Sequence, residues 1–212
     1  MRIATVLFLV CAACNSEGDG PPDRPPPASV RERVEAGETR LQISAADSAG
    51  TITARRKVAG GAWEVGLADL AIDHGELVIS ADAAGTITLD RLAFTFAPIV
   101  IPPGVFAYDA ALTNVRARLA KPARAMTRWV DDDEAHTTVT LELDVSWALT
   151  IDGGTLQLGS PDLPPITIHA DLTGTGAFVH ADVRASAIGE LWSWADLVKL
   201  EDLNLIVRAD TP

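Results

Sequence analysis

Apolar and polar residues alternate without a break over residues 138–151. The apolar positions are Val139, Leu141, Leu143, Val145, Trp147, Leu149 and Ile151. Because successive side chains of a β-strand point to opposite faces, this pattern predicts one long strand that buries a single face.

Shorter alternating stretches recur along most of the chain. They cover residues 41–45, 51–58, 63–72, 76–81, 86–96, 105–119, 155–158, 166–173, 177–187 and 203–209. Turn-forming residues separate them, among them Asp73-His74-Gly75 and Asp152-Gly153-Gly154, so neighbouring strands are expected to pair antiparallel. The predicted fold class is mainly β: an antiparallel meander of long strands that forms an extended curved sheet or a sandwich, with one or two short helices.

One hairpin can be assigned a register from the sequence. A two-residue turn at Gly174-Thr175 would pair Thr173 with Gly176. The inward face would then place Ile166, Ile168, Ala170 and Leu172 opposite Val183, Ala181, Val179 and Ala177. All eight are apolar and share one face, as the pleat of a sheet requires.

Three stretches depart from strand periodicity. Ser29 and Glu32 have the spacing of a capping box and predict a short helix. Ser193, with Asp196 three residues later, predicts a second one that would cover the apolar face of the sheet. Residues 121–136 are expected to be irregular.

Two segments share the same repeated phrase, by which we mean a strand, an Asp-x-Gly sequence and a second strand in that order. Leu70 to Ile79 has the pattern of Leu149 to Leu158, an offset of 149 − 70 = 79 residues. Either the chain contains an internal duplication around residues 63–96 and 142–173, or two unrelated hairpins have the same turn residues.

The first residues have the features of an export signal. Met1-Arg2 precedes an uncharged stretch over residues 3–13, which is shorter than the roughly 20 apolar residues that span a bilayer. The stretch ends in Val10-Cys11-Ala12-Ala13-Cys14, which resembles the bacterial lipobox, with Cys11 where that motif usually has Leu. The resemblance implies cleavage after Ala13 and acylation of Cys14, for instance with palmitate.

The expected organisation is a signal peptide over residues 1–13, a lipidated cysteine and Pro/Gly-rich tether over 14–28, and one β-rich domain over 29–212. A lipoprotein of this kind would lie in the cell envelope, at the outer membrane facing the periplasm or the surface, with the membrane as its partner through the anchor. The alternative is ordinary cleavage that leaves Cys14 as a free thiol. Cys11 and Cys14 are the only cysteines of the sequence, so the rest of the chain has none for disulfides or thiolate chemistry.

Charge excludes one class of partner. Without residues 1–13 the chain loses only Arg2, which leaves 16 basic and 29 acidic residues and a formal charge of 16 − 29 = −13. Such a surface repels phosphate backbones, so nucleic acid is not expected as a partner. The sequence has no nucleophile elbow, phosphate loop or HExxH helix, and we expect neither enzymatic activity nor a cofactor.

The repeated phrase at residues 63–96 and 142–173 resembles the repeats of AsmA-like proteins. That resemblance implies a long curved sheet with an apolar groove and an association with phospholipid movement between membranes. The chain departs from the family in being short and in having a predicted lipid anchor in place of a transmembrane segment.

The functional hypothesis that follows is that the domain binds an apolar ligand, such as a lipid. The predicted groove is lined by Val139, Leu141, Leu143, Val145, Ala177, Val179 and Ala181. Small alanines on an inward face leave room for a guest, unless facing residues such as Phe94, Phe96 and Trp147 fill the space. The alternative is a structural or protein-interaction domain, a closed sandwich or barrel with no ligand.

A third hypothesis concerns metal. The predicted register places His169 directly opposite His180, with Asp171 and Asp182 two residues along each strand. Imidazoles and carboxylates in this arrangement bind zinc and similar ions, although a solvated strand face has the same composition.

Overall fold

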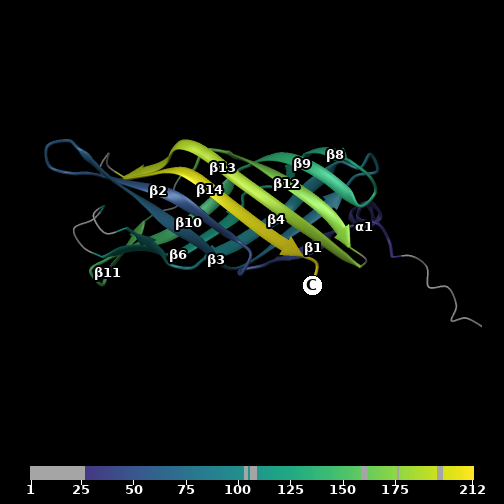
Figure 1. Cartoon of the computed structure of the whole chain (residues 1–212), viewed down its shortest axis with the longest axis horizontal. Coiled ribbons are helices and arrows are strands. Elements are labelled where there is room, and N and C mark those ends of the chain that lie inside the picture. The colour runs from purple at the N-terminus through teal and green to yellow at the C-terminus, as the bar shows by residue number, and fades with distance from the viewer. Residues whose placement is uncertain (1–26, 103–104, 106–108, 159–161, 176, 195–197) are drawn as a thin grey trace, which may run out of the picture.

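The computed structural model describes the chain except residues 1–26, 103–104, 106–108, 159–161, 176 and 195–197 (Figure 1). One helix, α1 (Val30–Ala36), precedes the strands. The strands are β1 (Thr39–Ile43), β2 (Ala49–Lys57), β3 (Trp63–Ala81), β4 (Ile87–Phe96), β5 (Ile99–Ile101), β6 (Ala110–Leu119), β7 (Ala123–Arg124), β8 (Met126–Trp129), β9 (Glu134–Leu141), β10 (Leu143–Ile151), β11 (Gly154–Leu158), β12 (Ile166–Thr175), β13 (Phe178–Trp194) and β14 (Val198–Asp210). The predicted mainly β, antiparallel meander is confirmed.

The 14 strands occupy eight positions around one sheet. β1 and β2 share a position because both pair with β3 on one side and with β14 on the other. Strands that follow one another along the chain also share a position in four other cases: β4 with β5, β6 with β7 and β8, β9 with β10, and β11 with β12. In these, the short strands β5, β7, β8 and β11 each pair on one side only. β3, β13 and β14 each fill a position alone.

The sheet curves until its first and last positions pair. β14 contacts β1 through Gln42↔Asp210 and β2 through Ile206↔Ala49, so the strands close into an elongated barrel. Figure 1 shows the strands crossing the long axis obliquely, with α1 at one end and β11 at the other. Inward side chains are mostly apolar and outward ones are largely polar, as the pleat and the alternating pattern require.

Helix α1 packs against one end of the barrel. The predicted capping box is present: Ser29 accepts a hydrogen bond from the Glu32 backbone N–H, and the Glu32 carboxylate accepts one from Ser29 N–H. Val30 and Val34 are 1% and 0% exposed and belong to the interior cluster. The backbone N–H of Val30 also donates to Asp133 Oδ1 at 3.0 Å, which ties the helix to the turn between β8 and β9.

The predicted strand over residues 138–151 is confirmed as β9 and β10, which Glu142 separates. The predicted turn at Asp73-His74-Gly75 is wrong, since β3 runs through it with a β-bulge between Ile72 and His74. A Cβ on Gly75 would lie 2.6 Å from Phe94 Cβ, so this glycine permits close strand contact and does not form a turn. The turn at Asp152-Gly153 is confirmed, with positive φ at both residues.

The predicted register of the β12–β13 hairpin is wrong by four residues. The strands pair Thr175 with Phe178 and Thr173 with His180. An even shift leaves every side chain on its predicted face, because the period of a strand is two. Gly174 lies within β12, where a Cβ would be 2.6 Å from Val30 Cγ2, so it accommodates α1.

Two predictions of irregular or helical structure are also wrong. Residues 121–136 contain β7, β8 and the start of β9, joined by a short turn after Val130. Ser193 and Trp194 end β13 and Val198 begins β14, so no helix starts at Ser193, while residues 195–197 lie outside the described part. Pairing between the two strands, including Trp194↔Val198, overrides the local capping signal.

The two segments of the repeated phrase have different structures. The first is part of the continuous strand β3, whereas the second is the β10–β11 hairpin.

No helix in the described part of the chain is both long enough and apolar enough to cross a membrane.

Candidate functional site

The barrel encloses an apolar cavity of about 150 Å³. Its described lining comes from strands all around the barrel and is apolar apart from one residue, Thr137. The Thr137 hydroxyl donates a hydrogen bond to the carbonyl of Ala170 at 3.1 Å, so it has a partner within the sheet. The cavity therefore favours an apolar occupant.

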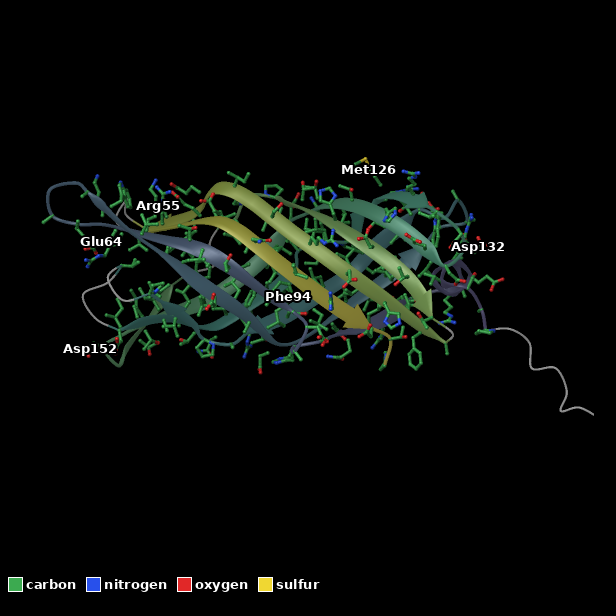
Figure 2. The ribbon with its side chains drawn as sticks, viewed as in Figure 1. Arg55, Glu64, Phe94, Met126, Asp132 and Asp152 are labelled. Carbon is green, nitrogen blue, oxygen red and sulfur yellow. The ribbon has the colours of Figure 1, made fainter. Side chains whose placement is uncertain are left out.

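Aromatic residues fill much of the space around the cavity. Phe94 and Phe96 meet edge to face with ring centroids 5.1 Å apart, and Trp147 and Trp192 do the same at 5.2 Å. Phe94 lies about midway along the barrel (Figure 2). The large facing side chains anticipated from the sequence thus occupy part of the interior and leave the cavity between them.

Among the described residues, strand pairing around the barrel is incomplete on one side. β12 pairs with β13 only as far as Ile168↔Ala185, whereas β11 pairs with β10. Among the described residues, those of β13 beyond Ala185 pair only with β14. We call this place, between β11 and residues 186–194 of β13, the wall gap.

Inward apolar side chains near the wall gap are only half-buried. They include Leu143, Leu163, Ala187, Trp192 and Leu203, which pack against the interior cluster without being fully covered. All of these except Ala187 also line the cavity. The interior is therefore accessible from this side.

Five of the seven predicted groove residues are buried inside the barrel: Val139, Leu141, Val145, Val179 and Ala181. Leu143 is half-buried beside the wall gap, and Ala177 is exposed next to the first residue of β13. Val139, Leu141, Leu143, Val145 and Ala181 line the cavity. The inward residues face an enclosed space because the sheet closes.

The two predicted metal ligands are not brought together. His169 lies opposite Arg184 and Thr138, and His180 lies opposite Thr173 and Asp210. His180 Nδ1 pairs with the Asp210 carboxylate, and His169 Nδ1 lies 3.0 Å from Thr138 Oγ1. The four-residue difference in register explains why His169 and His180 do not face each other. The described part of the chain contains no group of three or more His, Cys, Asp or Glu residues that could bind a metal ion.

Charged residues are concentrated on the outer face. Across β13 and β14, the hydrogen bond from Lys199 and a second one from Ser193 lower the pKa of Glu190. At the α1 end, backbone hydrogen bonds from Thr86 and Ala84, with the Arg124 charge, lower the pKa of Asp82 against a smaller opposing effect of desolvation.

A second hollow lies on the outer surface, with a volume of about 590 Å³. Gln42, His74, Arg116 and other polar residues line it, but three of its charged residues are already paired. Arg118 lies 3.1 Å from Asp144, and Glu76 lies 3.3 Å from Arg91. The cavity inside the barrel is the better candidate site because its described lining is apolar except for Thr137.

The wall gap was not predicted from the sequence, and the apolar interior was predicted as a groove and not as an enclosed cavity. Residues 159–165 carry Pro161, Pro164 and Pro165 between two strand patterns, and proline cannot donate to a sheet ladder. That composition is the signal that could have located the gap. Cys14, the predicted lipidation site, lies outside the described residues.

No protein-family description and no curated protein matches this chain. Two solved structures of Ail, the attachment invasion locus protein of Yersinia pestis, are similar, one of them in complex with the heparin analogue sucrose octasulfate. Their TM-scores are 0.36 and 0.34, each with 11% identity over 82% of this chain and 99% of Ail. Similarity at this level does not define a shared function.

Proposed function

We propose that this chain is a lipid-anchored protein of the cell envelope whose barrel holds a small apolar molecule. The enclosed apolar cavity of about 150 Å³ carries the proposal. An apolar cavity of about this size, 150 Å³, stays dry and binds benzene in an engineered protein. At about 24 cal/mol per Å³, such an empty space costs roughly 3 to 4 kcal/mol of stability, part of which an occupant would recover.

Size restricts the occupant. Ordinary ligand pockets enclose about 300–1,000 Å³, so the cavity in this conformation suits a benzene-sized group. A lipid acyl chain, the ligand class expected from the sequence, would require the half-buried side chains at the wall gap to move apart.

Ligand binding can be tested with benzene on the purified full chain, using Ala181→Trp and Ala187→Trp. Ala181 is 2% exposed and lines the cavity, whereas Ala187 is half-buried beside the wall gap and does not line it. We expect wild type and Ala187→Trp to bind one benzene and to gain about 3 °C in melting temperature at ten times Kd. Ala181→Trp should remain folded, fill the cavity and show no gain.

All three proteins would be measured in the same detergent, so partitioning of benzene into micelles is common to them. No gain in the wild type would contradict ligand binding and favour the structural or protein-interaction domain. Unfolding of Ala181→Trp alone would show that position 181 has no spare volume.

The lipid anchor is proposed from the lipobox-like residues that end at Cys14. The helix lies at the end of the barrel opposite β11 (Figure 1), so a membrane anchor that precedes it would attach at that end. Metabolic labelling with palmitate provides the test. The wild type and Cys11→Ser should incorporate label and Cys14→Ser should not, whereas label that persists in Cys14→Ser would exclude this anchor.

A further inference from the structure

The hollow on the outer surface, which we call the outer hollow, is crossed by one row of polar side chains. The row consists of His74, Thr95, Arg116 and Ser146, which are cross-strand neighbours on β3, β4, β6 and β10. Directly opposite side chains in such a row have Cβ atoms about 5 Å apart. The volume of the outer hollow, about 590 Å³, lies within the range of about 300–1,000 Å³ that is usual for small-molecule sites.

Arg116 is an exposed residue of this row, and it has no carboxylate partner among the described residues. Arg118, two residues further along β6, shows the usual arrangement, with an ion pair of 3.1 Å to Asp144. Arg91 and Arg208 also form ion pairs with carboxylates on adjacent strands. Because the chain has 29 acidic and 17 basic residues, carboxylates are abundant, and their absence beside Arg116 leaves its guanidinium available to a ligand.

Two hydroxyl groups flank Arg116 where other arginines of the sheet have a carboxylate. Thr95 lies opposite it on β4, and Ser146 lies opposite it on β10. Neither hydroxyl has a hydrogen-bond partner in the described part of the chain. A guanidinium presents a planar fork of N–H donors that matches two oxygens of a carboxylate or phosphate group, and hydroxyls can donate to the same oxygens.

The sheet departs from a regular ladder beside this row. On β3 the extra residue of a β-bulge is Asp73, whose carboxylate lies 2.9 Å from His74 Nδ1. On β6 two residues, Asn114 and Val115, occupy the space opposite Trp147 alone, and Asn114 has a φ of +53°. Bulges change the direction of side chains and are frequent beside functional sites, where left-handed non-glycine residues also occur. These two bulges therefore support a binding role for the row.

We infer that the outer hollow binds a small polar molecule through a carboxylate or phosphate group, which accepts hydrogen bonds from Arg116, Thr95 and Ser146. The carboxylates of Glu76 and Asp144 also line the outer hollow, so they repel the anion and restrict it to the part next to Arg116. The formal charge of the chain, −12, repels anions at long range, and binding therefore depends on these local donors. This site faces away from the interior cavity and does not depend on a ligand there.

The test is an NMR titration of the full chain in detergent with inorganic phosphate and, separately, acetate, at constant ionic strength. Arg116→Gln removes the guanidinium, and Arg116→Lys keeps the charge without the planar fork. Thr95→Val and Ser146→Ala each remove one hydroxyl. Arg128→Gln is the matched control, because Arg128 is an exposed arginine on the outer face of β8 and does not line the outer hollow.

Wild type and Arg128→Gln should bind one equivalent of at least one probe with equal Kd, and the backbone resonances of Thr95, Arg116 and Ser146 should shift. Arg116→Gln should weaken binding about tenfold, because charge-assisted hydrogen bonds are lost. Arg116→Lys should recover only part of this loss, and each hydroxyl variant should weaken binding about threefold. The probe with the lower Kd identifies the group, phosphate or carboxylate, that the site prefers.

Three results would overturn the inference. They are the failure of both probes to bind the wild type, unchanged affinity in Arg116→Gln, and equal weakening in Arg128→Gln, which would indicate general attraction to positive charge. Full affinity in Arg116→Lys would reject recognition by the guanidinium fork. All the substituted side chains lie on the outer face, so the variants should fold, and an unchanged amide spectrum away from the outer hollow verifies this.

Discussion

The two ends of the barrel are built differently. At the α1 end, β8 pairs with β9 alone, but the buried Val30 and Val34 of α1 cover the interior. Toward the β11 end, β13 continues beyond Ala185 with β14 as its one described partner, and some inward residues there, such as Trp192 and Leu203, are only half-buried. In Figure 2, Asp132 marks the first end and Asp152 the second.

This contrast indicates where a ligand could enter. Local opening requires least free energy where few apolar contacts and few strand pairs must be broken. The wall gap meets both conditions, whereas the α1 end is closed by a helix that is hydrogen-bonded to the turn before β9. We therefore expect stability to be concentrated at the α1 end and access at the wall gap.

The largest difference is expected for truncation of leucines. Leu41 is 1% exposed near the α1 end, and Leu203 is half-buried beside the wall gap. Leu41→Ala should lower the free energy of unfolding by about 3 kcal/mol, because it leaves a cavity in a covered site. Leu203→Ala should cost about 1 kcal/mol, because the site is already partly hydrated.

Urea denaturation at constant m-value measures both changes. Equal losses would mean that the two ends are packed alike and that the wall gap is not a weaker part of the barrel.

A smaller difference is expected for two glycines. Gly174 contacts α1, and an added Cβ would lie 2.6 Å from Val30 Cγ2 and 2.9 Å from Asp133 Oδ1. Gly174→Ala should therefore cost about 2 kcal/mol through crowding. Gly189 lies at the wall gap with φ of +93° and open space around it, so Gly189→Ala should cost about 1 kcal/mol through backbone strain alone.

Hydrogen exchange distinguishes the two effects. Gly174→Ala should increase exchange in α1, while Gly189→Ala should leave α1 protected. Increased exchange of α1 in both variants would show that the two ends are not independent.

Local patterns in the sequence predicted the strands and one helix, because the formation of these elements depends on residues close together in the sequence. Alternation over residues 138–151 and the capping box at Ser29 depend on neighbouring residues alone. The faces of β12 and β13 were also correct, since an even error of register does not exchange them.

Features that depend on distant residues could not be predicted in the same way. Gly75 and Gly174 have the composition of turns, but Phe94 and Val30 determine that they are contact points between elements. The metal hypothesis failed with the register, since it required His169 to face His180. The cavity depends on closure of the whole barrel, which follows from pairing between strands far apart in sequence.

The smallest effect is expected when the contributions of the two ends to stability are compared as the pH falls. Asp82, in the turn between β3 and β4 near α1, has a pKa below its ordinary value of 3.8, chiefly because Thr86 and Ala84 backbone N–H groups donate to it. A carboxylate whose pKa is lower in the folded state stabilises the fold above its unfolded pKa, and this contribution is lost as the pH falls through the folded value. Glu190, beside the wall gap, has its pKa lowered mainly by Lys199 and follows the same rule.

Asp82→Asn and Glu190→Gln should each reduce the loss of stability between about pH 5 and pH 2, because each removes one linked proton. Both groups are solvent-exposed, so the changes will be small and are best measured as slopes of unfolding free energy against pH. Salt should reduce the Glu190 effect more than the Asp82 effect, because an exposed ion pair is screened whereas backbone hydrogen bonds are not. Equal sensitivity to salt would indicate that the Arg124 charge, and not the turn, sets the pKa of Asp82.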